Sequence, residues 1–175
     1  MVREHPPVDE RALPIVEAKI EVAASVADVF DLAQDYDLRL RWDPFLREMK
    51  FRDGAIEAAP GVRVWVRAKN GLAMEVVYIT LERPHSVAMK MTRGPWFFER
   101  FAGTWRFEQV RGDFTAVTFR YNFETRWPWL RSFSNALIAR IFEHDIRQRL
   151  SGLKHGAEQT DLLRELRAKR ADAAR

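Results

Sequence analysis

The stretch FTAVTFRYNFETRWPWLRSFSNALIARIF, residues 114–142, contains the change of pattern that decides the fold. In its first part every second residue is apolar, which is the period of a β-strand with one buried face. Pro128 then stands between Trp127 and Trp129, and proline is well tolerated at the first position of a helix. From Leu130 to Leu153 the apolar residues recur at helical spacing. The stretch therefore predicts the last strand of a sheet followed directly by one long amphipathic helix.

About six short strands precede that helix between Phe45 and Arg126. Asn70-Gly71 is a strong hairpin signal, and the other connections are also short, so neighbouring strands should pair in antiparallel fashion. One helix cannot cover a whole face of so large a sheet. The chain must leave a space between sheet and helix or fill it with large side chains.

Upstream, residues 15–22 alternate as a strand, and Ser25 can cap a short helix that ends near Asp35. A second helical turn ends at Asp43-Pro44. We expect a polar arm over residues 1–14, one domain over 15–156 and a basic extension over 157–175. The extension can be interpreted as a short basic amphipathic helix or as a frayed, solvated tail.

Composition narrows the class of protein. The chain of 175 residues has no cysteine, so it has neither a disulfide nor a thiolate nucleophile or ligand. No signal-peptide core and no run of about 20 apolar residues is present, which predicts a cytoplasmic protein. The net charge is +4, and arginines at strand positions alternate with glutamates, which favours cross-strand ion pairs over nucleic-acid binding.

The stretch from Ile20 through Val29-Phe30 to Trp42-Asp43-Pro44 resembles the opening of the SRPBCC, or START-like, superfamily, in particular the polyketide cyclase/dehydrase and lipid-transport branch. Gly61 at the start of a strand and Leu150 to Lys154 near the end fit as well, and the resemblance covers about residues 15–156. It implies an α+β helix-grip fold: a curved antiparallel sheet of about seven strands wrapped around the C-terminal helix, with two short helices after the first strand. It also implies an apolar cavity between sheet and helix, but no shared catalytic residues.

The candidate cavity lining consists of the side chains expected on the inward faces of the strands and of the long helix. They are Met74, Tyr78, Met89, Met91, Glu99, Phe101, Trp105, Phe119, Tyr121, Phe123, Phe133, Leu137 and Ile141.

Glu99 is the most informative ionisable residue, because strict alternation puts its carboxylate on the apolar face of Phe101 and Trp105. It either anchors a ligand or transfers protons, or it lies solvated at the rim. Tyr121 is a second catalytic candidate, although Tyr78 and Tyr121 are equally explained by structural hydrogen bonds. Asp145 lies either on the cavity side or at the edge of the helix stripe. Trp127 and Trp129 either pack at the helix start or cover a cavity mouth, where they could touch a membrane.

No metal site or cofactor is predicted. The four histidines lack the i,i+4 spacing of a helical zinc site, and no glycine-rich phosphate loop or nucleophile elbow is present.

We therefore expect first a protein that binds or carries a small apolar molecule, such as a lipid, polyketide, quinone or aromatic compound. The alternatives are an enzyme of the polyketide cyclase/dehydrase type, and a protein- or membrane-interaction module that uses the basic extension. Ligand identity and oligomeric state are left open.

Overall fold

The computed structural model describes residues 14–126, 131–173 and 175. Within this part, residues 131–135 are described by their backbone alone. Along these residues the elements follow in the order β1 (Ile15–Val22), α1 (Val26–Gln34), α2 (Tyr36–Trp42), β2 (Leu46–Phe51), β3 (Arg63–Ala68), β4 (Ala73–Glu82), β5 (Ser86–Arg93), β6 (Phe98–Arg111), β7 (Phe114–Thr125), α3 (Arg131–Gln159) and α4 (Leu162–Ala173).

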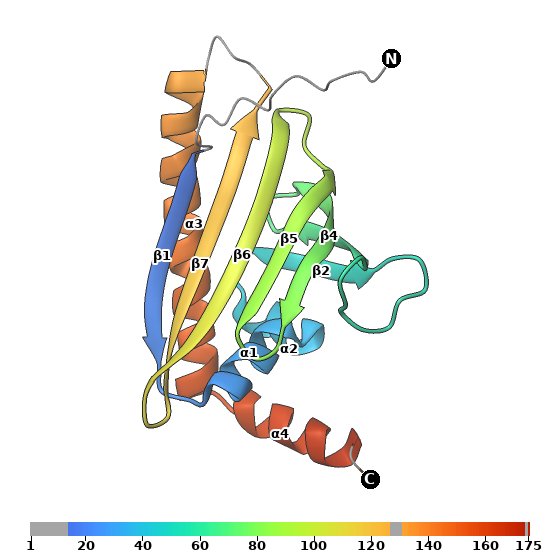
Figure 1. Ribbon diagram of the computed structural model, residues 1–175, viewed down its shortest axis with the longest axis vertical. Coiled ribbons are helices and arrows are strands. Elements are labelled where there is room, and N and C mark those ends of the chain that lie inside the picture. Colours follow the sequence, from blue (N-terminus) through green and yellow to red (C-terminus); the bar gives the residue numbers. More distant parts are fainter. Residues whose placement is uncertain (1–13, 127–130, 174) are drawn as a thin grey trace, which may run out of the picture.

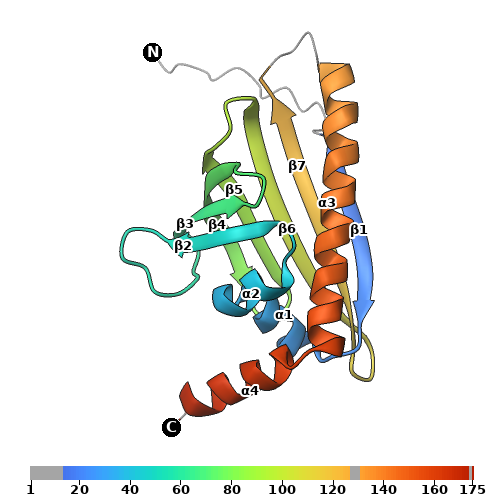
Figure 2. The same cartoon turned by 180° about the vertical axis from the view of Figure 1, so that it is seen from behind.

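The strands form a single seven-stranded antiparallel sheet in the order β1-β7-β6-β5-β4-β3-β2 (Figure 1). Strands β2 to β7 are a meander, and β1 pairs with β7, the last strand. Helix α3 runs along β1 and β7 on one face of the sheet (Figure 2). The predicted helix-grip architecture with two short helices after the first strand is confirmed. None of the described helices is both long and apolar enough to cross a membrane.

Strict alternation fails at the start of β6. Phe98 pairs with Thr125 and Arg100 pairs with Glu124, so the bulge at Glu99 sets two steps of β6 against one step of β7. Phe98 is buried in place of Glu99, whose side chain is 53% exposed beside Arg126. The prediction that Glu99 shares the apolar face was wrong because a bulge reverses the side on which the preceding residues point.

Two glycines bring α3 close to α2. A Cβ added at Gly152 would lie 2.4 Å from the carbonyl oxygen of Trp42, and one at Gly156 would lie 2.9 Å from the Trp42 Cβ. The indole of Trp42 is held from the other side, where its N–H donates to the carbonyl of Leu32 at 3.2 Å. The missing side chains of both glycines therefore provide the space in which the Trp42 segment lies.

The basic extension is an ordered helix rather than a frayed tail. Leu162, Leu163 and Leu166 of α4 are buried. Arg167 and Arg170 each donate to a different carboxylate oxygen of Asp28 in α1, both at 2.7 Å. Part of the positive charge of the extension is therefore paired with a carboxylate of the same chain.

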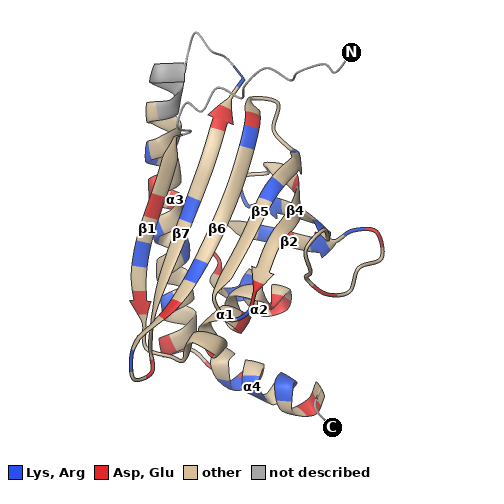
Figure 3. Cartoon of the chain, viewed as in Figure 1, with Lys and Arg blue, Asp and Glu red and all other residues tan. Residues whose placement is uncertain are grey.

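Charges of both signs lie side by side on the outer face of the sheet (Figure 3). Arg63 contacts Glu75 at 3.2 Å, and Arg100 contacts Glu124 at 3.7 Å across neighbouring strands. These are the predicted cross-strand pairs. A fully exposed pair contributes at most about 1 kcal/mol, but the Glu75 side chain is only 9% exposed.

Candidate functional site

A cavity of about 310 Å³ lies between α3 and the sheet. Its wall is mostly apolar and comes from every strand between β2 and β7, including Met49, Val66 and Phe98. Polar side chains reach it mainly from α2 and α3, namely Arg39, His144, Asp145, Gln148 and Arg149. The cavity is therefore the space that a single helix leaves uncovered, with an apolar wall opposite a polar one.

The structure brings seven of the thirteen predicted cavity residues to this wall. They are Met74, Met89, Phe101, Trp105, Phe119, Tyr121 and Ile141.

Five further predicted residues do not line it in the described structure. Tyr78 is buried against α2, and Phe123 is fully buried among the rings of Phe98 and Phe142. Leu137 is 54% exposed on the outer side of α3. Met91 packs at the edge of the core and Glu99 points away, while the side chain of Phe133, like Trp127 and Trp129, lies outside the described residues.

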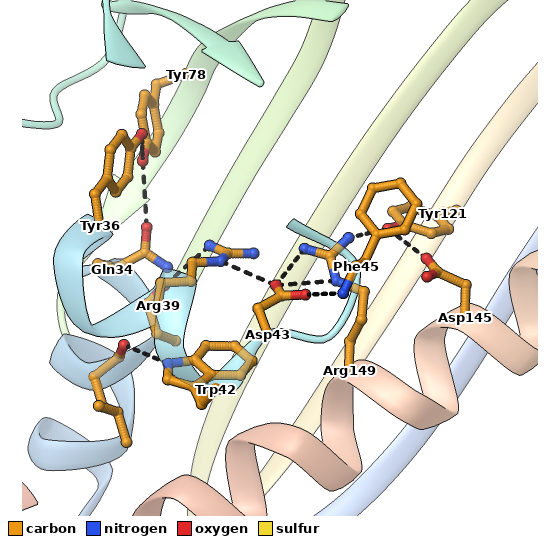
Figure 4. A network of polar contacts seen from close by, with 12 residues as sticks. Gln34, Tyr36, Arg39, Trp42, Asp43, Phe45, Tyr78, Tyr121, Asp145 and Arg149 are labelled. Carbon is orange, nitrogen blue, oxygen red and sulfur yellow. Dashed lines mark hydrogen bonds and ion pairs between the residues drawn. The ribbon is translucent and has the colours of Figure 1, made fainter. Parts of the chain in front are cut away.

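The polar wall is organised around one carboxylate, that of Asp43 (Figure 4). Arg39 donates from Nε to Asp43 Oδ2 at 3.3 Å, and Arg149 donates to the same oxygen from Nε at 3.2 Å and from Nη2 at 2.8 Å. The backbone N–H of Phe45 donates to the other oxygen at 3.1 Å. The Asp43 side chain is 0% exposed and the two arginines are 4% and 6% exposed, so this is a buried ion cluster joining α2 to α3.

Aromatic rings cover the flat faces of both guanidinium groups. The guanidinium carbon Cζ of Arg149 lies 5.0 Å from the ring centres of Phe45 and Phe119, and Cζ of Arg39 lies 5.2 Å from the ring centre of Trp105. Cation–π contacts of this kind are strongest where water is excluded. Stacking leaves only the N–H edges of the guanidinium groups for polar contacts.

Tyr121 connects the ion cluster to a second carboxylate. Its hydroxyl accepts a hydrogen bond from Arg149 and donates one to Asp145 Oδ2 at 3.3 Å. Asp145 therefore lies on the cavity side of α3, which was one of the two positions left open by the sequence. A separate pair lies deeper, where the hydroxyls of Tyr36 and Tyr78 share a hydrogen bond of 2.8 Å.

The pKa values of the two carboxyls are shifted in opposite directions. Burial alone would raise the pKa of Asp43, but the attraction of Arg149 and Arg39 outweighs it and holds that pKa below its ordinary value. At Asp145 burial prevails over the attraction of Arg149, and the pKa is raised. Burial also raises the pKa of the Tyr121 hydroxyl. Tyr121 is therefore a neutral hydrogen-bond donor near neutral pH, and Asp145 is the group in this wall best suited to hold a proton.

We expect Asp145→Asn to be more stable than the parent protein at neutral pH. A carboxyl whose pKa is raised by folding contributes stability below its unfolded pKa of about 3.9 and loses it as pH rises through the folded pKa. Asparagine imitates the neutral form, so its advantage should shrink as the pH is lowered toward 4. Melting temperatures across this pH range measure the effect.

Glu143→Gln, on the exposed side of the same helix, should bring no such gain, because Glu143 pairs with Arg147 in solvent. A less stable Asp145→Asn protein at pH 7 would contradict the assigned direction of the pKa.

Sequence reasoning missed the arginines. Arg149 lies within the apolar stripe of α3, three residues after Ile146 and one before Leu150, and a charge in such a stripe needs a buried partner. Arg39 stands four residues before Asp43, the spacing of an ion pair on a helix. Both signals can be recognised in the sequence, but the long-range contact between Arg149 and Asp43 cannot.

The described residues contain no group of three or more His, Cys, Asp or Glu side chains that could hold a metal ion.

Comparison with known proteins identifies the family. The family described as "Polyketide cyclase / dehydrase and lipid transport" matches residues 14–158. No curated protein matches the sequence.

Solved structures share the fold at low sequence identity. An aromatase/cyclase from a Streptomyces species has a TM-score of 0.71 at 15% identity, covering 84% of this chain and 94% of that one. A START superfamily protein from Mycobacterium smegmatis has a TM-score of 0.67 at 12% identity, covering 83% and 97%. Norcoclaurine synthase from Thalictrum flavum has a TM-score of 0.64 at 11% identity, covering 84% and 94%. With the family match spanning most of the chain, this protein belongs to the polyketide cyclase/dehydrase and lipid-transport family.

Proposed function

We propose that this protein binds a small, largely apolar molecule in the cavity between α3 and the sheet. The observation that carries the proposal is the cavity itself, whose volume of about 310 Å³ lies at the small end of the range of about 300–1,000 Å³ for ligand sites. Its wall combines a broad apolar surface with a few convergent polar groups, which is the usual composition of such sites. The family description, which includes lipid transport, supports the same assignment.

Gly103 supports the view that the space is kept open. It lies in the middle of β6 and lines the cavity, where a Cβ would meet Tyr121 and Phe119 at ordinary contact distances of 3.5 and 3.7 Å. A larger side chain is therefore accommodated by the strand but extends into the cavity. Glycine in a strand interior is otherwise unfavourable relative to residues with side chains.

We expect Gly103→Val to keep the fold and to weaken ligand binding by at least tenfold. Valine suits a strand, while its methyl groups occupy cavity volume. Binding is measured with the neutral apolar dye N-phenyl-1-naphthylamine, whose fluorescence rises in apolar surroundings, and native mass spectrometry of gently purified protein detects co-purified ligand.

Ala102→Val is the matched control, because Ala102 is the adjacent residue of β6 and does not line the cavity. Equal dye affinity in both variants would place the binding site elsewhere. A ligand-free mass together with no dye binding would overturn the proposed function.

A second candidate function, acid–base catalysis on the bound molecule, is favoured by one observation. Asp145 lines the cavity with a raised pKa and accepts a hydrogen bond from Tyr121, so a proton donor or acceptor faces the ligand space. Glu99, the other candidate from the sequence, is too far outside the cavity for this role. Loss of turnover with unchanged dye binding in Asp145→Asn would distinguish an enzyme from a carrier.

A further inference from the structure

The buried ion cluster has more positive than negative charge. Arg39 and Arg149 both donate to Asp43, and among the described residues no second carboxylate contacts either guanidinium group. Arginine stays protonated in proteins, so the three side chains together carry one excess positive charge. Because all three are at most 6% exposed, this charge is placed where solvation is poor and where a missing counter-charge is costly.

The hydrogen-bonding capacity of the two arginines is also incompletely used. They make five hydrogen bonds to described groups: three to Asp43, one from Arg39 to the Ala33 carbonyl and one from Arg149 to Tyr121. Two guanidinium groups carry ten N–H donors. Arg39 Nη2 has no hydrogen bond to any described residue, although Arg39 lines the cavity. Arg39 therefore retains donor capacity at the cavity wall.

The other charged groups of the cavity wall do not neutralise this edge. Asp145 attracts Arg149 and bonds to its partner Tyr121, but it forms no ion pair with Arg39. His144 lines the cavity from the exposed side of α3 and is not an anion. Burial, together with repulsion from Arg149, lowers the pKa of Arg39 despite the attraction of Asp43, whereas at Arg149 the attraction of Asp43 outweighs burial and the pKa is raised. Arg39 is therefore the arginine of the cluster whose charge is less well compensated.

We infer, resting on the proposed function, that the bound molecule is an apolar acid whose carboxylate pairs with Arg39 beside Arg149. A carboxylate supplies the one negative charge that is lacking and two oxygens that match a guanidinium edge. A phosphate monoester would bring close to two negative charges at neutral pH against one excess positive charge. The apolar part of the acid lies along Met74, Met89 and Phe101 on the opposite wall.

The test compares acids with neutral molecules of the same skeleton. Decanoic acid and methyl decanoate, and 2-naphthoic acid and its methyl ester, compete at pH 7 for the neutral dye N-phenyl-1-naphthylamine. We expect each acid to bind at least tenfold more tightly than its ester. Arg39→Gln should reduce the affinity of the acids by about tenfold and change that of the esters by less than twofold.

Arg147→Gln is the matched control, since it removes one positive charge from an exposed position of α3 and should leave both affinities unchanged. If the protein binds the dye and the acids compete no better than the esters, the inference is overturned while the proposed function stands. If neither dye nor competitor binds, the proposed function itself fails.

A second measurement needs no variant and applies even where Arg39→Gln does not fold. Carboxyl-¹³C-labelled decanoic acid bound to the parent protein should titrate at least one pH unit below the free acid, because the excess positive charge favours the ionised form. An unchanged or raised pKa of the bound acid would overturn the inference.

Discussion

Asp43→Ala is expected to lower the free energy of unfolding by about 3–5 kcal/mol, the largest effect that we predict for this protein. The substitution leaves Arg39 and Arg149 buried side by side without their shared counter-ion. It also removes the acceptor of the Phe45 backbone N–H. Urea or guanidinium denaturation followed by circular dichroism measures the loss.

Asp37→Ala is the matched control, from the first turn of α2, the helix that Asp43 follows directly. The Asp37 side chain is 91% exposed and lies 3.6 Å from Lys169, so its removal should cost no more than about 1 kcal/mol. A similarly small loss at Asp43 would show that water reaches the two arginines. The lowered pKa of Asp43 adds a pH signature: its stabilising contribution is present above the unfolded pKa of about 3.9 and is lost as the pH falls through the folded value. Asp43→Ala should lose this part of the acid sensitivity.

Gly152→Ala is expected to destabilise the protein by about 1–3 kcal/mol, the cost typical of overpacking. Helix propensity alone predicts the opposite sign, because alanine is about 1 kcal/mol better than glycine inside a helix. The added Cβ would lie 2.4 Å from the backbone oxygen of Trp42, and backbone cannot rotate away as a flexible side chain can. Thermal and chemical unfolding of the variant measure both the sign and the size.

Ser151→Ala, at the exposed neighbouring position of α3, should be neutral or slightly stabilising. A more stable Gly152→Ala protein would mean that α3 can shift away from α2 at little cost.

The fold could be predicted from the sequence because its signals are local and mutually consistent. The alternation of β1 and the Ser25 cap, whose oxygen accepts from the Asp28 N–H at 3.3 Å, both appear in the structure as expected. The candidate site was harder to predict from the sequence than the fold. A bulge changes the phase of a strand without changing its composition, which is why Glu99 was placed on the wrong face.

Contacts between distant parts of the chain set the remaining limit. Gly152 and Gly156 indicate a weakened helix end when only α3 is considered, and their meaning depends on Trp42. Asp145 could be assigned to the cavity side only once Tyr121 was placed opposite it. The arginines of the cavity wall depend in the same way on the packing of α3 against α2.

The bridge between Asp43 and Arg149 joins residues that are 106 positions apart. During synthesis from the N-terminus, the sheet strands and Arg39 therefore emerge well before the residue that completes the polar wall of the cavity. A nascent chain that ends before α3 has neither the covering helix nor the second guanidinium group. The cavity between α3 and the sheet is thus complete only in an almost finished polypeptide.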